Sequence, residues 1–137
     1  MLKDADYARL LTVRTTLRRF ERWSAEQAAA QGLTASQHQL LLAVRGHGGD
    51  QGPTVGEVAD YLFIQHHSAV ELVNRTERAG FLLRSRDDED HRVVRLQLSA
   101  EGAHRLEALT ATHVDELGRL AALVESMVGA LGGGRSG

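Results

Sequence analysis

The residues with the most informative chemistry lie between positions 66 and 92. A His-His-Ser cluster occupies residues 66–68, and an acidic run at 87–90 leads directly into His91 and Arg92. Imidazole, hydroxyl and guanidinium groups donate hydrogen bonds to phosphate oxygens, and carboxylates beside a histidine can serve as acid–base groups. Catalysis is the weaker interpretation, because the acidic run and His91 fall in a polar turn open to water, with no orienting partner in the pattern.

Two β-compatible segments flank that polar turn. The first covers residues 81–86, and the second covers residues 93–98 and alternates, with Val94, Leu96 and Leu98 on one side. Alternation of this kind predicts strands with one buried face. The pair therefore predicts an antiparallel hairpin with the acidic run and Arg92 at its tip.

Two short helical patterns precede the hairpin. Thr54 and Glu57 have the spacing of a capping box and start a helix to residue 62, and a second helix is predicted over 65–79, closed by Gly80. In the second helix the predicted inner face consists of Ala69, Leu72, Val73 and Thr76. Two helices joined by a short turn and followed by a hairpin are typical of a winged helix-turn-helix.

Three further helices are predicted around this block. Apolar spacing indicates helices over residues 6–31, 34–47 and 99–131, with Thr34 and Gln37 forming another capping box. Residues 132–137 are glycine-rich and are expected to form a flexible tail. The predicted organisation is a single domain over 1–137, with a winged-helix lobe at 34–98.

The first and last helices each carry an apolar stripe that a small winged helix cannot cover. Pairing these helices across a twofold axis would bury both stripes, so we expect a homodimer. The predicted dimer contacts are Leu10, Val13, Leu17, Leu117, Leu120, Val124 and Met127.

Composition narrows the class of protein. The net charge is −2, so charge alone does not announce nucleic-acid binding, although four of the six acids in residues 65–98 are confined to the acidic run. The chain has no cysteine, which excludes disulfides and thiolate metal sites. With no apolar run long enough to span a membrane and no secretory signal, a cytoplasmic protein without membrane association is expected.

Several stretches resemble the multiple-antibiotic-resistance-regulator (MarR) family. They are Leu33-Thr34-Ala35-Ser36-Gln37, residues 68–82, and the most specific motif, Asp90-x-Arg92-x-x-x-Leu96-x-Leu98-Ser99. The resemblance runs from about residue 7 to residue 131, and it departs from the family at Thr76, where a leucine is usual. It implies a mainly α fold with a small antiparallel wing, and a homodimeric regulator, most often a repressor, on a pseudo-palindromic DNA operator.

The resemblance also implies which residues face DNA. In the helix over 65–79 these are His66, His67, Ser68, Val70, Glu71, Asn74 and Arg75. In the wing, Asp90 and Arg92 match an ion pair whose arginine is available to the minor groove, where negative potential favours a guanidinium. Arg84 and Arg86 are expected near phosphates.

Effector binding is a further implication of the resemblance. Family members often bind small aromatic acids, and Arg14, Arg18, Trp23 and His38 are candidates to line such a pocket, although each also has an ordinary structural explanation. Zinc is disfavoured, because His38 and His113 belong to no His-x-x-x-His pair. No metal, cofactor or catalytic residue is therefore assigned.

Three alternatives stay open beside the ligand-responsive regulator. One is a DNA-binding protein without small-molecule control, which phenolic acids would leave unaffected. Another is a winged helix that binds proteins, whose binding would lack the salt dependence of phosphate contacts. The third is an enzyme built on His91 and the acidic run.

Overall fold

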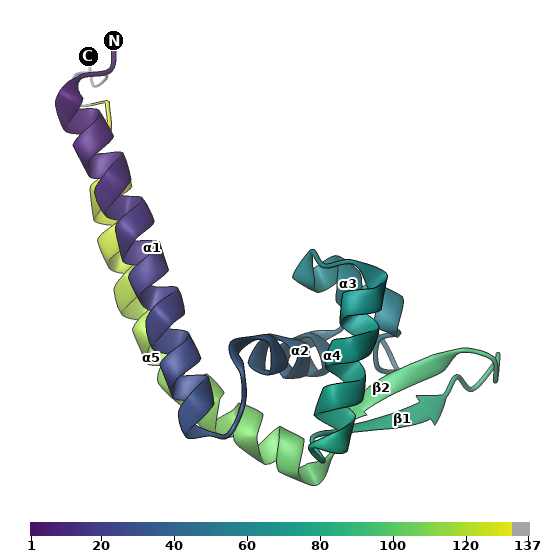
Figure 1. Cartoon of the computed structure of the whole chain (residues 1–137). Coiled ribbons are helices and arrows are strands. Elements are labelled where there is room, and N and C mark those ends of the chain that lie inside the picture. Colours follow the sequence, from purple (N-terminus) through teal and green to yellow (C-terminus); the bar gives the residue numbers. More distant parts are fainter. Residues whose placement is uncertain (133–137) are drawn as a thin grey trace. The chain divides into compact units, whose positions relative to one another are not determined.

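The computed structural model describes residues 1–132 and contains five helices and one two-stranded sheet over that range. The helices are α1 (Asp4–Ala30), α2 (Ala35–Gly46), α3 (Val55–Leu62), α4 (His66–Arg78) and α5 (Ala100–Gly129), and the strands are β1 (Leu82–Arg86) and β2 (Val94–Leu98) (Figure 1). This is the mainly α winged helix-turn-helix that the sequence predicts. Most of the predicted glycine-rich tail, residues 133–137, lies outside the described residues.

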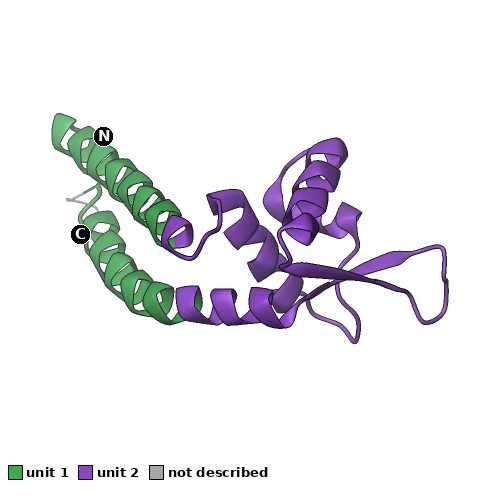
Figure 2. Ribbon diagram, turned by 60° about the horizontal axis from the view of Figure 1, so that its bottom comes forward, with its two compact units in different colours: residues 1–27, 110–137 green, residues 28–109 purple. Residues whose placement is uncertain are grey.

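The chain divides into two compact units (Figure 2). Unit 1 contains residues 1–27 together with the chain from residue 110 onward, and unit 2 contains residues 28–109. In unit 1 the two helical segments run side by side. The Asp6 carboxylate accepts a hydrogen bond from the Gly132 backbone N–H (2.8 Å), and Ser24 Oγ lies 2.7 Å from His113 Nε2.

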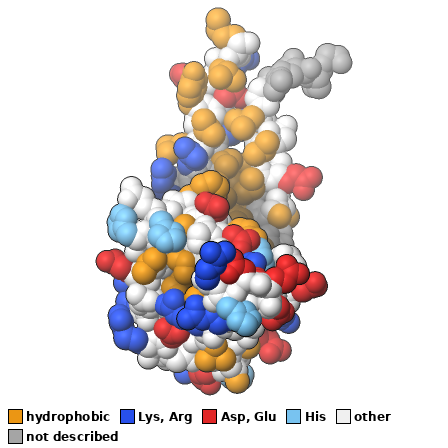
Figure 3. Space-filling model, turned by 90° about the vertical axis from the view of Figure 1, so that its right-hand side faces the viewer, with side chains coloured by type: hydrophobic (Ala, Val, Ile, Leu, Met, Phe, Trp, Pro, Cys, Tyr) orange, Lys and Arg blue, Asp and Glu red, His pale blue; other side chains and the backbone are white. Residues whose placement is uncertain are grey.

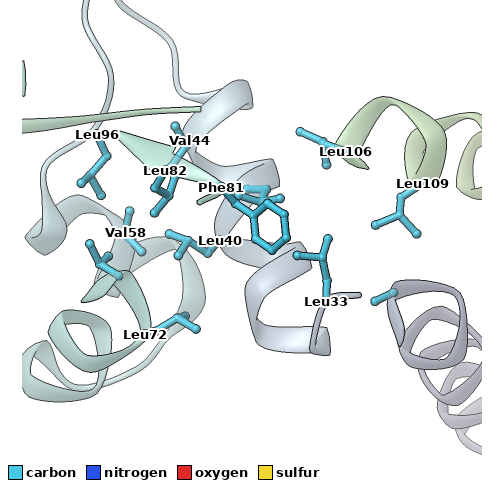
Figure 4. Packing of buried hydrophobic residues seen from close by; sticks show 13 residues of the cluster. Leu33, Leu40, Val44, Val58, Leu72, Phe81, Leu82, Leu96, Leu106 and Leu109 are labelled. Carbon is cyan, nitrogen blue, oxygen red and sulfur yellow. The ribbon is translucent and has the colours of Figure 1, made fainter. Parts of the chain in front are cut away.

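Unit 2 is organised around an aliphatic core. Leu40, Leu41, Val58, Val73 and Leu96 have no solvent-exposed area and come from α2, α3, α4 and β2 (Figure 4). Aliphatic side chains packed to this degree gain their stability from removal of apolar surface from water. The core thus fixes α4 and the hairpin on one scaffold.

Local capping chemistry sets the helix boundaries in unit 2. Thr34 and Thr54 each accept a hydrogen bond from the N–H three residues later, and both capping boxes predicted from the sequence are present. The turn between α3 and α4 passes through Phe63, which has φ of +54° and whose ring is almost fully exposed. That left-handed residue is unusual for a bulky side chain, and it reverses the chain where the sequence predicts a break.

The loop before α3 is held against the hairpin. The Leu96 N–H donates to the Pro53 carbonyl (2.9 Å), and a Cβ on Gly52 would lie 1.7 Å from the Leu96 carbonyl oxygen. Only glycine allows two backbones to approach this closely. The attachment of this loop to β2 joins segments more than 40 residues apart, and no local sequence pattern predicts it.

None of the helices across residues 1–132 combines the length and apolar character that crossing a bilayer requires.

Candidate nucleic-acid interface

Helix α4 has one buried face and one polar face, as the sequence predicts. Ala69, Leu72, Val73 and Thr76 are all buried. Thr76 fits the core because its hydroxyl donates to the Leu72 carbonyl (2.7 Å), which satisfies the only polar group it brings inside. A threonine in place of the usual leucine is therefore accommodated.

The opposite side of α4, called the outer face below, carries the residues that the family resemblance assigns to DNA. His66, His67, Glu71 and Arg75 are exposed, and Ser68, Val70 and Asn74 are half-buried at its edges. The residue before the helix, Gln65, makes no side-chain capping bond. The first N–H groups of α4 are consequently left without that side-chain partner, next to two imidazoles and a hydroxyl.

The wing, defined as β1, β2 and the residues that join them, carries Arg92, whose side chain is held in place by an ion pair with Asp90. The Arg92 guanidinium binds the Asp90 carboxylate through Nε to Oδ1 and Nη2 to Oδ2, both at 3.0 Å, and the Arg92 N–H also donates to Asp90. These bonds hold the pKa of Asp90 below its ordinary value, with the Arg92 side chain as the main cause. The Arg92 side chain nevertheless stays 90% exposed. A guanidinium so oriented keeps its remaining donors for an outside partner.

Asp87 organises the wing, a role that the sequence pattern does not predict for it. Its Oδ2 accepts the N–H groups of Glu89 (2.9 Å) and Asp90 (2.8 Å), and its Oδ1 accepts from Gln51 Nε2 and Arg95 Nε, both at 3.0 Å. An Asp that binds backbone N–H groups two and three residues later is a recognised turn signature. The acidic run is therefore a built turn and not simply a solvated one.

Arg95 links this turn to the helical part of unit 2. Sequence alternation places Arg95 on the outward side of β2, but its side chain is only 23% exposed and pairs with both Asp87 (2.9 Å) and Glu57 (3.2 Å). Glu57 in turn accepts from the Thr54 N–H and lies 3.4 Å from His47 Nε2. The pKa of Glu57 is lowered, chiefly by the Thr54 backbone donor. These bonds connect the loop before α3, helix α3, the turn of the wing and strand β2.

The hydrogen bonds to Asp87 make the stability of unit 2 sensitive to acid. They lower the pKa of Asp87 from 3.8 to about 2, with the N–H groups of Asp90 and Glu89 as the largest causes and Arg95 as a further one. A carboxylate whose pKa is lower in the folded chain stabilises the fold above its unfolded pKa, and this contribution is lost as pH falls through the folded value.

We therefore expect Asp87→Asn to reduce the free energy of unfolding most above about pH 5, with the difference from wild type shrinking as the pH approaches about 2. Urea unfolding across this pH range measures the difference. A difference that stays constant with pH would show that the charge on Asp87 contributes nothing.

The other two wing arginines have partners within unit 2. Arg84 Nε donates to Glu77 Oε2 on α4 (3.0 Å), and its Nη2 donates to Asn74 Oδ1. Arg86 Nη1 donates to the His91 carbonyl across the turn (3.2 Å). Figure 3 shows the end of unit 2 that bears the wing, where basic, acidic and histidine side chains are intermixed. The electrostatic character of this surface is thus local and not a uniform basic patch.

The residues predicted to bind an effector or to form dimer contacts differ in how much of each is exposed to solvent. In unit 1, Arg14 and Arg18 are exposed, and the Trp23 ring lies 4.8 Å from the His113 ring and 5.8 Å from the Phe20 ring. In unit 2, His38 is buried. Val13, one of the predicted dimer contacts, is already buried within unit 1.

Much apolar surface of unit 1 remains uncovered. Leu10 and Leu117 are about half exposed and Leu17 more than one-third exposed, whereas Leu120, Val124 and Met127 are half-buried. Tyr7, Leu11, Leu123 and Val128 add further exposed apolar side chains. No group of three or more histidine or acidic side chains that could hold a metal occurs within residues 1–132.

Comparison with known families interprets this arrangement. A family model described as MarR family matches residues 31–93, which hold α2, α3, α4, β1 and the turn of the wing. Residues 31–93 belong to the MarR family. MarR-family proteins are DNA-binding transcription regulators and not enzymes, so the catalytic interpretation of His91 and the acidic run is discarded.

Several solved structures share the fold beyond the matched region. A MarR family protein from Bacillus stearothermophilus is 23% identical, with a TM-score of 0.72 over 88% of this chain and 82% of that one. The S. aureus MepR–DNA complex is 19% identical, with a TM-score of 0.70 over 80% and 77%. The YusO protein of Bacillus subtilis is 23% identical, with a TM-score of 0.63 over 88% and 85%. No curated protein sequence matches the chain.

Proposed function

We propose that this MarR-family protein is a ligand-responsive repressor that binds a pseudo-palindromic operator as a homodimer. The observation that carries the proposal is the pairing, within unit 2, of the exposed outer face of α4 with an exposed arginine held on the wing by Asp90. In a winged helix-turn-helix the second helix binds in the major groove, and the wing contacts the neighbouring minor groove or backbone.

The outer face of α4 has groups that suit base edges and phosphates. His66, His67 and Ser68 stand at the helix N-terminus, where backbone N–H groups and the helix dipole favour a phosphate. Val70 can contact a thymine methyl group, and Glu71 can accept from cytosine N4. Arg75, one turn after Glu71, is long enough to reach the backbone or to pair with that carboxylate. The MepR–DNA complex among the structural neighbours is in keeping with such docking.

The wing supplies the second contact. Arg92 is proposed to enter the minor groove, where its charge is favoured by the narrow groove's negative potential. Asp90 orients the Arg92 guanidinium. Arg86 lies on the same hairpin, where its Nη1 donates to the His91 carbonyl, and it is proposed to contribute to phosphate binding. Three acids at positions 88–90 weaken the general electrostatic attraction of the wing to DNA, so its contribution to affinity should come mainly from the oriented Arg92 side chain.

Dimer formation is proposed from the uncovered apolar side chains of unit 1. A second copy of the chain would bury Leu10, Leu17 and Leu117, which water now contacts. Leu117→Glu is expected to convert the dimer to a monomer in light scattering at micromolar concentration. Leu42→Glu, at a similarly exposed leucine in unit 2, is the matched control and should remain dimeric. A wild-type mass equal to that of one chain would contradict the proposal.

Ligand control is proposed for a small aromatic acid. Within unit 1, Arg14 and Arg18 offer charge for a carboxylate and Trp23 offers a ring, although Trp23 already packs with Phe20 and His113. His38, which the sequence also predicts for this role, is buried in unit 2. A ligand that favours a different spacing of the two DNA-binding lobes would release the operator by shifting populations. A DNA-binding protein without small-molecule control would keep its operator affinity in the presence of phenolic acids.

Selection of bound fragments from a random DNA pool tests the function as a whole. A twofold-symmetric consensus with half-sites about 10 base pairs apart is expected, because successive major grooves on one side of B-DNA lie about 34 Å apart. Affinity for that consensus should fall steeply as salt rises. Failure to enrich any sequence, or binding insensitive to salt, would favour the protein-binding alternative.

A further inference from the structure

A clamp joins the wing to the outer face of α4. The Arg84 guanidinium on β1 donates through Nε to Glu77 Oε2 (3.0 Å) and through Nη2 to Asn74 Oδ1. About two-thirds of the Arg84 side chain is shielded from solvent, in contrast to the Arg92 side chain, which is 90% exposed. The Arg84 guanidinium is thus hydrogen-bonded to side chains of α4, whereas the Arg92 side chain extends into solvent.

The clamp determines which way the Asn74 amide faces. A guanidinium carries only hydrogen-bond donors, so the amide atom that meets Arg84 must be the oxygen. The Asn74 NH2 group is on the other side of the same planar amide and points away from Arg84. Asn74 is half-buried at the edge of the outer face, three residues after Glu71. Its free group at that surface is therefore a donor.

This orientation changes the base that asparagine can recognise. An unconstrained asparagine pairs with adenine by accepting from N6 and donating to N7, which requires both ends of the amide. In this protein one lone pair of the oxygen is already bound to the Arg84 guanidinium. That bond fixes the plane of the amide and withdraws electron density from the oxygen, so acceptance from adenine N6 is weakened. The NH2 group fits acceptors instead, namely guanine O6 and N7 or thymine O4.

We propose that Arg84 is a positioning residue that sets the base preference of Asn74, through its grip on the amide oxygen, and does not itself bind phosphate. The proposal rests on the proposed function, since it requires α4 to enter the major groove. Glu77 contributes by holding the Arg84 Nε, which keeps the guanidinium in register with Asn74. This role differs from the phosphate contact that the sequence predicts for Arg84, and the salt dependence of binding distinguishes the two.

The experiment compares four single variants and one double variant by fluorescence anisotropy, on the operator that wild type selects and on all its single base-pair replacements. Arg84→Met removes the guanidinium that forms the clamp but retains an unbranched apolar stem, and Arg84→Lys retains the charge with a single ammonium group as donor. Asn74→Ala removes the reading group. Arg78→Met is the matched control, because it removes the same charge from α4 one residue after Glu77. Circular dichroism and urea unfolding establish that each variant is folded.

Asn74→Ala is expected to relax preference at one base pair or two adjacent ones in each half-site. At those same positions Arg84→Met should move the preference toward adenine by about fivefold or more, the discrimination that one good asparagine–adenine pair supplies. Arg84→Lys should retain most of the wild-type preference. The double variant Asn74→Ala/Arg84→Met should match Asn74→Ala at these positions, and Arg78→Met should leave the preference unchanged.

The salt dependence separates positioning from phosphate binding. Loss of one phosphate contact lowers the slope of log affinity against log salt by about 1, so Arg84→Met should leave that slope unchanged. An unchanged base preference in Arg84→Met, or a slope lowered by about 1, would overturn the clamp proposal while DNA binding itself stands. If wild type selects no sequence from the pool, the proposed function fails first and the inference falls with it.

Discussion

Replacement of Arg92 by alanine is expected to lower operator affinity at least tenfold at moderate salt while the fold is retained. The side chain is 90% exposed, and its principal partner is Asp90 in the same turn, so its loss removes little internal packing. What it removes is a preoriented guanidinium whose insertion into a narrow minor groove is favourable. Anisotropy titration measures the affinity, and the change should also lower the salt slope by about 1.

Arg22→Ala provides the matched control for that prediction. Arg22 is also an exposed arginine paired with a carboxylate, Glu26, at 3.5 Å, but it lies on α1 in unit 1. It removes the same formal charge without touching the wing, and its effect on affinity should be within about twofold. Equal losses for Arg92→Ala and Arg22→Ala would mean that overall charge, and not the wing, governs binding.

The largest loss of stability is expected from Gly52→Ala. The added Cβ would lie 1.7 Å from the Leu96 carbonyl oxygen and 2.9 Å from its carbonyl carbon, and both atoms belong to the backbone of β2. Relief of such a contact requires the loop to leave β2 and strains the Leu96 N–H bond to Pro53. We expect the free energy of unfolding to fall by roughly 3 kcal/mol, at the upper end of overpacking effects.

Gly48→Ala in the same loop is the control, because a Cβ at Gly48 has no other atom within 4 Å. Its effect on urea unfolding should be within about 0.5 kcal/mol, as for most surface substitutions. If Gly52→Ala proves as stable as Gly48→Ala, the close packing of this loop on β2 is wrong.

The helices and their faces were predictable because the signals that specify them are local. Thr34 and Thr54 cap their helices through groups only three residues away, and apolar spacing alone identifies the buried face of α4. The inward side of β2 follows from alternation, with Leu96 fully buried. Such features need no knowledge of the rest of the chain.

The connections that shape the candidate interface were not predictable, because they join distant segments. Asp87 binds Gln51 and Arg95, and Arg84 binds Glu77 on α4. The hydrophobic periodicity of the sequence does not predict contacts between such separate elements. One signal was available: an aspartate at the start of a polar turn often binds N–H groups two and three residues later. The exposed surface of unit 1 was anticipated from its apolar stripes, except that Val13 is covered by unit 1 itself.

Reading of the operator by the outer face of α4 is tested by repeating the random-pool selection with a variant of that face. Glu71→Gln is suitable, because Glu71 is exposed and the substitution changes its charge and hydrogen bonding with little change in shape. The predicted result is a consensus with the same twofold symmetry and half-site spacing but altered bases within each half-site. A consensus identical to that of wild type, obtained also with Val70→Ala, would contradict the assignment of α4 as the reading helix.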